Sequence, residues 1–288
     1  MKNNKKVLIL GANGMLGEEL VKSFQKGGYS VLAWDVEELD ITNKEKTGEA
    51  IKRENPFLII NAAAYNAVDQ AEEKEEFEKA MQINAYAPEN LAKIAKETEA
   101  IFVHFVSDYI FDGKKGEYVE DDQPCPISNY GISKAEGEKR TQNAGGKYYL
   151  IRTSKIFGKS AEQEGAKKSF FEVMLSLAKE KNELKVIDSE KSCFTYAPDL
   201  ARAVKSLVEN KHPFGIYHLV NEGAVTWYEG VLELFKIAGI NEVKVRPVKP
   251  EEFLRPAKRP ASSVLLNTKF PKLRRYEEAL KDWLHNNL

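Results

Sequence analysis

The sequence is poor in cysteine. Only Cys125 and Cys193 occur among 288 residues, and they lie far apart in no metal-binding or redox spacing. This spacing argues against a disulfide framework and against a zinc site. We therefore expect no metal ligands in the chain, and we expect a reducing, cytoplasmic location.

Long apolar runs and an excess of one charge are also missing. No run approaches the roughly eighteen residues that span a bilayer, and the short VLIL after the basic start does not make a secretory signal. The formal net charge is −1, from 43 basic and 44 acidic residues, whereas a general nucleic-acid binder carries a basic excess. We therefore expect neither a membrane nor a nucleic-acid partner.

Short apolar runs alternate with amphipathic stretches over the first half of the chain. This rhythm is typical of parallel strands that helices cover on both faces, so we predict an α/β protein with a Rossmann-type, doubly wound parallel sheet. After residue 154 the rhythm loosens into a smaller α/β lobe. The predicted strands are 6–10, 30–35, 57–63, 101–107, 148–154, 184–188 and 215–220, and the predicted helices are 15–27, 43–54, 72–97, 130–144, 167–180, 199–210 and 227–238.

Three glycines lie between the first strand and the first helix, at Gly11, Gly14 and Gly17. In this context Gly11 permits a tight turn, Gly14 lets the backbone approach a pyrophosphate, and Gly17 lets the helix pack closely. The helix N-terminus offers N–H groups and partial positive charge to phosphates. We therefore predict a dinucleotide-binding domain over 1–154, with later segments from about 184–220 contributing, and a mainly substrate-binding lobe over 155–288.

Two acidic residues compete for the adenosine part of this cofactor. Asp35 ends the second strand, where a carboxylate accepts hydrogen bonds from the ribose hydroxyls and repels a 2′-phosphate. Asp40 follows closely in LDIT (39–42) and is better placed for the adenine. The cofactor is therefore NADH or NADPH, with a lean toward NADH.

A proton-donating set is indicated by Ser107, Tyr130 and Lys134. Ser107 ends a strand, where ligands bind in open parallel sheets, and Tyr130 and Lys134 share one face of the helix that follows. A keto group that is reduced by hydride needs an acid at its oxygen. We expect Tyr130 to be that acid, Lys134 to lower its pKa, and Ser107 to fix the substrate oxygen. His104, on a strand expected to be buried, is interpreted as a core residue.

Taken together, these segments resemble the extended short-chain dehydrogenases/reductases and, among them, the dTDP-4-dehydrorhamnose reductase family. The resemblance covers nearly the whole chain. It rests on GANGMLG (11–17), LDIT (39–42), NAAAYNAVDQAE (61–72), INAYAPENLA (83–92), SDYIFDG (107–113), YGISKAEGE (130–138), IRTS (151–154), TYAPDLA (195–201), GIYHL (215–219) and RPASSVL (259–265).

The resemblance implies roles by position. Ser107, Tyr130 and Lys134 would form the catalytic triad, with Lys134 also binding the nicotinamide ribose. Members of the family reduce the 4-keto group of a nucleotide-linked deoxysugar, which implies conversion of dTDP-4-dehydrorhamnose to dTDP-rhamnose here. Further cofactor contacts are implied at Asn13, Met15, Leu16, Ile41, Ala62, Ala63, Ala64 and Tyr65.

The match weakens on the sugar side. Lys155 stands where the family has Trp, and Ser169 stands where it has Asn. The loop 189–195, SEKSCFT, replaces the family's Gln, Gly and Pro by Glu190, Ser192 and Phe194. We still expect the substrate side to include Asp108, Tyr109, Lys155, Ser169 and Arg259. Arg259 would contact the diphosphate or its nucleotide, and a surface arginine is the alternative.

Other functions stay open at this point. The drifted pocket could serve a different nucleotide-sugar, through a related reductase or an epimerase. The protein could also be a regulatory, NAD(P)-binding subunit, as in the β subunit of methionine adenosyltransferase, which resembles the same family. A dehydratase is disfavoured because Asp108 is followed by Tyr109 and not by Glu. The sequence does not settle the oligomeric state: it leaves open a homodimer, and it leaves open a divalent metal that bridges subunits.

Overall fold

The computed structural model describes residues 5–160 and 168–287. Its helices are α1 (Met15–Lys26), α2 (Lys44–Glu54), α3 (Lys74–Met81), α4 (Ala87–Glu97), α5 (Asn129–Ala144), α6 (Phe170–Ala178), α7 (Ala197–Glu209), α8 (Trp227–Ala238) and α9 (Tyr276–Asn287). Residue 167, where the helix predicted over 167–180 would begin, lies outside the described residues. The other helices predicted from the sequence are present, apart from the change over 72–97 described below.

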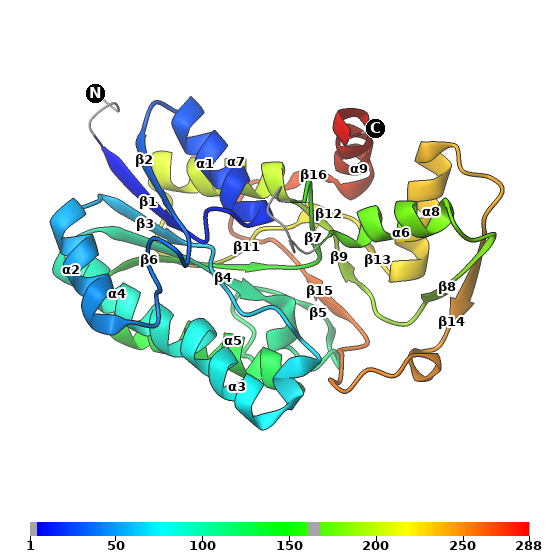
Figure 1. Ribbon diagram of the computed structural model, residues 1–288, viewed down its shortest axis with the longest axis horizontal. Coiled ribbons are helices and arrows are strands. Elements are labelled where there is room, and N and C mark those ends of the chain that lie inside the picture. Colours follow the sequence, from blue (N-terminus) through cyan, green and yellow to red (C-terminus); the bar gives the residue numbers. More distant parts are fainter. Residues whose placement is uncertain (1–4, 161–167, 288) are drawn as a thin grey trace.

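One sheet of six parallel strands organises the molecule (Figure 1). Its order is β2-β1-β3-β4-β6-β11, so the chain passes from β1 to one side and then crosses to the other at β3. Ligands bind at such a switch point, outside the carboxyl ends of the strands. The strands are β1 (Lys6–Leu10), β2 (Ser30–Trp34), β3 (Leu58–Asn61), β4 (Ile101–Ser107), β6 (Lys147–Thr153) and β11 (Gly215–His218).

Helices cover both faces of this sheet, which confirms the predicted doubly wound fold. Figure 1 shows α1 and α7 on one face and α2, α4 and α5 on the other. Successive residues of β1 serve opposite layers: Val7 and Ile9 pack in the core with α1 and α7, and Leu8 and Leu10 pack in the core with α2 and α4. The central strands β1, β3 and β4 are mostly apolar because both of their faces are buried.

The later part of the chain builds a second core beside the carboxyl ends of the strands. Aromatic side chains fill it, including Phe157, Phe171, Phe194 and Trp283. Within the segment 184–220, α7 and β11 belong to the large sheet's layers, whereas β8 pairs with β14 in this second part. The domain division at residue 154 stays a prediction.

The short strands are β5 (Gly116–Tyr118), β7 (Ile156–Phe157), β8 (Glu183–Ile187), β9 (Ser192–Cys193), β10 (Thr195–Tyr196), β12 (Asn221–Glu222), β13 (Ala224–Val225), β14 (Lys244–Val248), β15 (Ser263–Leu265) and β16 (Leu273–Arg275).

The helix predicted over 72–97 is broken into three parts. A π-helical turn at Gln82–Tyr86 joins α3 to α4, and a short 3₁₀ turn precedes α3. The π turn carries the carbonyl oxygen of Asn84 toward α5, where a Cβ on Gly137 would lie 2.0 Å from that oxygen. The bulge therefore follows from a tertiary contact, which helical periodicity does not predict.

Two absences can be stated for the residues that the structure describes. Over 5–160 and 168–287, no helix is both long and apolar enough to cross a bilayer. In the same residues, no group of three or more His, Cys, Asp or Glu side chains is arranged to hold a metal ion. Cys125 is exposed and Cys193 is buried, and both are free thiols.

Candidate active site

The glycine turn between β1 and α1 leaves its backbone open. Gly11 has φ +73°, and a Cβ there would lie 2.5 Å from the backbone nitrogen of Ala63. A Cβ on Gly17 would lie 2.0 Å from the carbonyl oxygen of Gly11, so both positions require glycine. Asn13 and Gly14 are exposed, and no side chain caps α1 at Gly14. The N-terminus of α1, which no side chain caps at Gly14, and the helix dipole fit the pyrophosphate of a dinucleotide.

The two carboxylates predicted near the adenosine lie after β2. Asp35 faces the glycine turn, because its carboxylate accepts a hydrogen bond of 3.0 Å from the backbone N–H of Asn13. Asp40 is turned toward its own loop, where it accepts hydrogen bonds from the backbone and the hydroxyl of Thr42. Ile41, which follows Asp40 in the chain, is buried in the core with α2 and α4. Asp35 is therefore the better placed of the two for a ribose beside the turn.

Residues 62–65 follow β3, next to the end of β1. The backbone N–H of Tyr65 donates to the Asn84 carboxamide, which donates in return to the Tyr65 carbonyl, both at 3.0 Å. The Tyr65 hydroxyl donates to Glu76 at 2.8 Å. Burial and this carboxylate raise the pKa of Tyr65 to about 12. The segment is thus fixed beside the turn, and Met15 and Leu16 begin α1 on the other side.

Ser107, Tyr130 and Lys134 come together at the carboxyl end of β4. Ser107 is the last residue of β4, and the other two lie one turn apart at the start of α5. The Tyr130 hydroxyl donates a hydrogen bond of 3.4 Å to the carboxamide oxygen of Asn66, and the Ser107 hydroxyl lies close enough to affect the pKa of Tyr130. The Lys134 ammonium donates to the carbonyl oxygen of Phe105 at 3.3 Å. A serine, a phenol and an ammonium group thus meet at one edge of the sheet.

Burial shifts the pKa values of both Tyr130 and Lys134. Burial raises the pKa of Tyr130, and the nearby Ser107 hydroxyl offsets part of that rise. The net shift is upward and not downward as expected, because burial outweighs any stabilisation of the phenolate by Lys134, whose ammonium is directed to the Phe105 carbonyl. The phenol therefore stays protonated at neutral pH, in the form that a proton donor needs. Burial also lowers the pKa of Lys134 to about 8.

The lowered pKa of Lys134 predicts a limit at alkaline pH. Lys134 is charged below about pH 8 and neutral above it, and only the charged form stabilises the phenolate that Tyr130 becomes after donating its proton. We expect kcat/KM for reduction to fall as the pH rises through about 8. A pH profile of kcat/KM measures this decrease. In Lys134→Arg the guanidinium stays charged. If kcat/KM of that variant falls at the same pH, Lys134 is not the group that causes the decrease.

Asp108 and Tyr109 lie next to these residues. The ring of Tyr109 meets that of Tyr130 edge to face, with ring centres 5.9 Å apart and planes at 82°. Asp108 accepts hydrogen bonds from Ser107 at 3.2 Å and from Ser263 at 2.5 Å. Its side chain is 3% exposed, and burial raises its pKa. Tyr109 therefore offers a ring beside the proton donor, while Asp108 ties β15 to the site.

Lys155 lies in a charged cluster just after β6. Its backbone is left-handed, with φ +38°, a conformation that favours glycine. The ammonium donates to the carbonyl oxygens of Glu190 and Val225 at 3.2 and 3.5 Å and lies 4.0 Å from the ring centre of Trp227. The Glu190 carboxylate binds Arg255 and the indole N–H of Trp227. Burial lowers the pKa of Lys155 to about 8. Two residues that depart from the family pattern, Lys155 and Glu190, are thus in direct contact.

Ser169 and Arg259 have clear partners in this structure. The Ser169 hydroxyl caps α6 by accepting a hydrogen bond from the N–H of Glu172, whose carboxylate accepts one from Ser169 in return. Arg259 makes two hydrogen bonds with the Asp69 carboxylate, at 2.8 and 2.6 Å. The role of Ser169 as the N-cap of α6 is enough to explain a serine at this position. For Arg259, contact with a diphosphate stays a prediction that requires exchange of this carboxylate.

Two further residues that contact the site were not predicted. Asn66 accepts from the Tyr130 hydroxyl, and buried Asn84 joins the 62–65 segment to Ser133 on α5, with a 3.0 Å hydrogen bond to its hydroxyl. Both lie inside motifs of the sequence, NAAAYNAVDQAE and INAYAPENLA, so a signal was present. His104 is fully buried, as predicted, and burial lowers its pKa to about 3.

Comparison with known proteins assigns the chain to a family. The family model described as "RmlD substrate binding domain" matches residues 5–288. The chain belongs to this family. A dTDP-4-dehydrorhamnose reductase of Aggregatibacter actinomycetemcomitans is 38% identical over 276 residues, which cover 92% of this chain and 91% of the relative.

Solved structures resemble this RmlD family member over its whole length. A dTDP-4-dehydrorhamnose reductase from Clostridium acetobutylicum is 38% identical, with a TM-score of 0.91, and the match covers 98% of this chain and 99% of that one. The Bacillus anthracis dTDP-4-dehydrorhamnose reductase in complex with NADP is 33% identical, with a TM-score of 0.92 and 100% of both chains covered. These likenesses confirm the Rossmann-type fold and the resemblance that the sequence motifs carry.

Proposed function

We propose that this protein reduces the 4-keto group of a deoxysugar linked to thymidine diphosphate, with a nicotinamide dinucleotide as the reductant. The observation that carries the proposal is the meeting of Ser107, Tyr130 and Lys134 at the carboxyl end of β4. The nearby glycine turn, open and uncapped, supports a dinucleotide there. The named relatives support dTDP-4-dehydrorhamnose as the substrate and dTDP-rhamnose as the product.

Each residue of the set has a distinct task in this reaction. When bound, the nicotinamide supplies a hydride to the keto carbon. The Ser107 hydroxyl holds the keto oxygen in place, and Tyr130 gives this oxygen its proton as negative charge develops there. Lys134 then stabilises the phenolate that remains. Asn66, in contact with the Tyr130 hydroxyl, orients the phenol before the transfer.

Asp35 supports a preference for NADH, while a relative holds NADP. We therefore propose that both cofactors bind and that Asp35 sets the ratio of kcat/KM for NADH over that for NADPH. Its carboxylate would repel a 2′-phosphate. We expect Asp35→Asn to lower the ratio of kcat/KM for NADH over that for NADPH by about tenfold, equivalent to about 1.4 kcal/mol. Asp40→Asn is the matched control, because Asp40 faces its own loop. An equal change in both variants would remove the assignment to Asp35.

A panel of dTDP-4-keto sugars with NADH and NADPH tests the function. We expect oxidation of the cofactor with dTDP-4-dehydrorhamnose. Cofactor binding without oxidation on any member of the panel would contradict the proposal and favour a regulatory subunit. The proton-donating set argues for the enzyme, since a module that only binds has no use for an acid. A homodimer and a cytoplasmic location complete the proposal.

A further inference from the structure

A buried ion pair lies behind the catalytic residues. The guanidinium of Arg152, on β6, binds both carboxylate oxygens of Glu138, on α5, at 2.6 and 2.8 Å. The two side chains are only 1% and 2% exposed. Two charges that have left water so completely persist only when their geometry is well satisfied. The motifs IRTS and YGISKAEGE contain these residues, but no role was predicted for either.

The third nitrogen of the Arg152 guanidinium, Nη1, contacts segments other than α5. It donates to the backbone carbonyl oxygens of Glu120 and Asp122 at 3.1 and 3.3 Å and lies 3.4 Å from Nε2 of His218. The guanidinium also lies 5.2 Å from the ring centre of Phe111, two residues after Tyr109. One side chain thus contacts α5, β11, the loop after β4 and the loop after β5.

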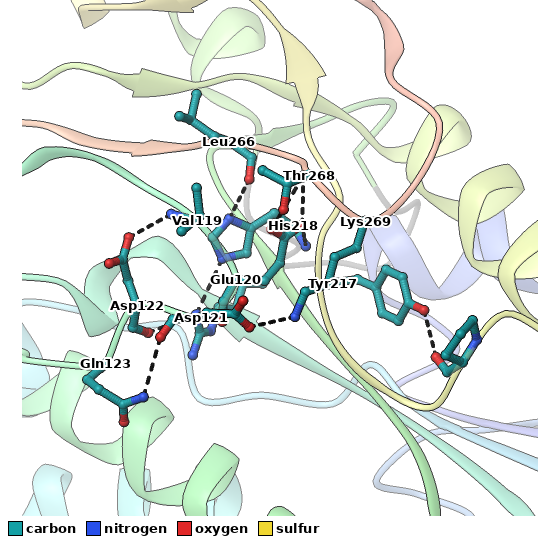
Figure 2. A network of polar contacts seen from close by, with 12 residues as sticks. Val119, Glu120, Asp121, Asp122, Gln123, Tyr217, His218, Leu266, Thr268 and Lys269 are labelled. Carbon is teal, nitrogen blue, oxygen red and sulfur yellow. Dashed lines mark hydrogen bonds and ion pairs between the residues drawn. The ribbon is translucent and has the colours of Figure 1, made fainter.

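The partners of Arg152 are themselves held. Figure 2 shows Glu120 and His218 at the centre of a polar network. The Glu120 carboxylate accepts hydrogen bonds from the backbone and hydroxyl of Thr268 and from the backbone of His218. Nδ1 of His218 lies 3.0 Å from the carbonyl oxygen of Leu266. The guanidinium is therefore set in a frame that does not readily move.

This frame lies directly beside the catalytic set. Arg152 pairs with Val106 in the sheet, and the next residue, Thr153, pairs with Ser107. Glu138 follows Lys134 by four residues on α5 and therefore shares its helix face. The bidentate bond thus fixes one face of the helix against the strand next to Ser107.

We propose that Arg152 is a positioning residue for the reduction proposed above. Through Glu138 it holds the helix that carries Tyr130 and Lys134 at a set distance from the strand that carries Ser107. Catalysis by positioned groups is sensitive to misplacement, and an error of about 1 Å can cost roughly 100-fold in rate. The glycine turn lies between β1 and α1, outside this network, so we expect the pyrophosphate contacts, and with them most of the cofactor affinity, to survive a change at Arg152.

Arg152→Lys tests the role with little risk to folding, because it keeps the charge and loses only the planar fork. We expect kcat for the dTDP-4-keto sugar to fall at least about tenfold. The Kd of NADPH, measured by fluorescence titration, should stay within about threefold of wild type, since the turn is untouched. Hydrogen exchange, which needs no substrate, should become faster in α5 and stay unchanged in α4.

A charge-free double variant separates positioning from stability. Arg152→Met alone leaves a buried carboxylate unpaired, whereas Glu138→Leu with Arg152→Met removes both charges and can restore stability. We expect the double variant to regain melting temperature and to keep a kcat at least about tenfold below wild type. The control is Arg140→Met, which removes half-exposed ion pairs of the same helix with Glu89 and Glu136 and should leave kcat within about twofold.

Two results would overturn the proposal. One is wild-type kcat and unchanged exchange of α5 in Arg152→Lys. The other is a double variant whose kcat recovers together with its melting temperature, which would show that the pair acts on stability alone. If the double variant does not fold, Arg152→Lys decides by itself. Absence of turnover in the wild type would instead refute the proposed function, and the exchange of α5 in Arg152→Lys would still decide the positioning role.

Discussion

Tyr130→Phe should lower kcat by roughly 10²–10⁴-fold, which is the usual contribution of a positioned general acid. The variant removes only the hydroxyl that meets Ser107 and Asn66. The ring is buried and packs against Tyr109, and phenylalanine keeps that packing. We therefore expect the fold and the Kd of NADPH to change little. Steady-state kinetics and a fluorescence titration on the same preparation measure both quantities.

The matched control is Tyr148→Phe, which removes a hydroxyl from the first half of β6 and should leave kcat near wild type. If Tyr130→Phe turns over a confirmed substrate at the wild-type rate, Tyr130 is not the proton donor. If its kcat falls only in proportion to a loss of folded protein, the hydroxyl acts on stability and not on chemistry.

Gly17→Ala should weaken dinucleotide binding at least about tenfold and lower the free energy of unfolding by about 1–3 kcal/mol. The added Cβ would lie 2.0 Å from the carbonyl oxygen of Gly11 and 2.8 Å from the Cα of Ala12. These contacts are backbone atoms of the turn itself, so they give way only if the turn changes shape. Denaturant unfolding and NADPH titration measure the two effects.

Gly48→Ala provides the control for the loss of a glycine. Gly48 lies inside α2, and a Cβ there would meet only the Ile94 Cδ1 atom at 3.9 Å. We expect this change to stabilise the protein by about 0.4–1 kcal/mol and to leave the Kd of NADPH unaltered. Equal Kd values for Gly17→Ala and wild type would show that the turn does not hold the pyrophosphate.

The glycine turn and the clustering of the Ser, Tyr and Lys side chains could be predicted because their signals are local. The spacing of Gly11, Gly14 and Gly17 follows directly from the turn between a strand and a helix. Ser107 ends a continuous apolar strand, and Tyr130 and Lys134 are four residues apart on a helix. Parallel strands bring their carboxyl ends to one edge, so these positions follow from chain order and sheet polarity.

Other features depend on contacts between distant residues, and local patterns do not contain them. The π turn at 82–86 places the Asn84 carbonyl against Gly137, where a side chain would not fit. Burial raises the pKa of Tyr130, and the Lys134 ammonium is directed to the Phe105 carbonyl; helix spacing shows neither. The pairing of Arg259 with Asp69 joins residues 190 positions apart.

The arrangement of the residues predicted for the substrate side could not be derived from the sequence. Lys155 and Glu190 were identified as departures from the family pattern, and the structure shows that they contact each other and Trp227. Ser169, in contrast, acts as the cap of α6. The contacts of Lys155 and the cap at Ser169 both depend on how the C-terminal lobe packs against the end of β6. Local sequence patterns do not determine this packing.

Transfer of deuterium to the sugar tests the proposed reduction most directly. Wild-type protein is given dTDP-4-dehydrorhamnose and a nicotinamide cofactor that carries deuterium at its reactive carbon, and the product is analysed by mass spectrometry and NMR. The expected result is dTDP-rhamnose with one deuterium on carbon 4 of the sugar, and almost none formed by Tyr130→Phe in the same time. Oxidation of the cofactor without label at carbon 4, or no reaction with this sugar, would contradict the assignment.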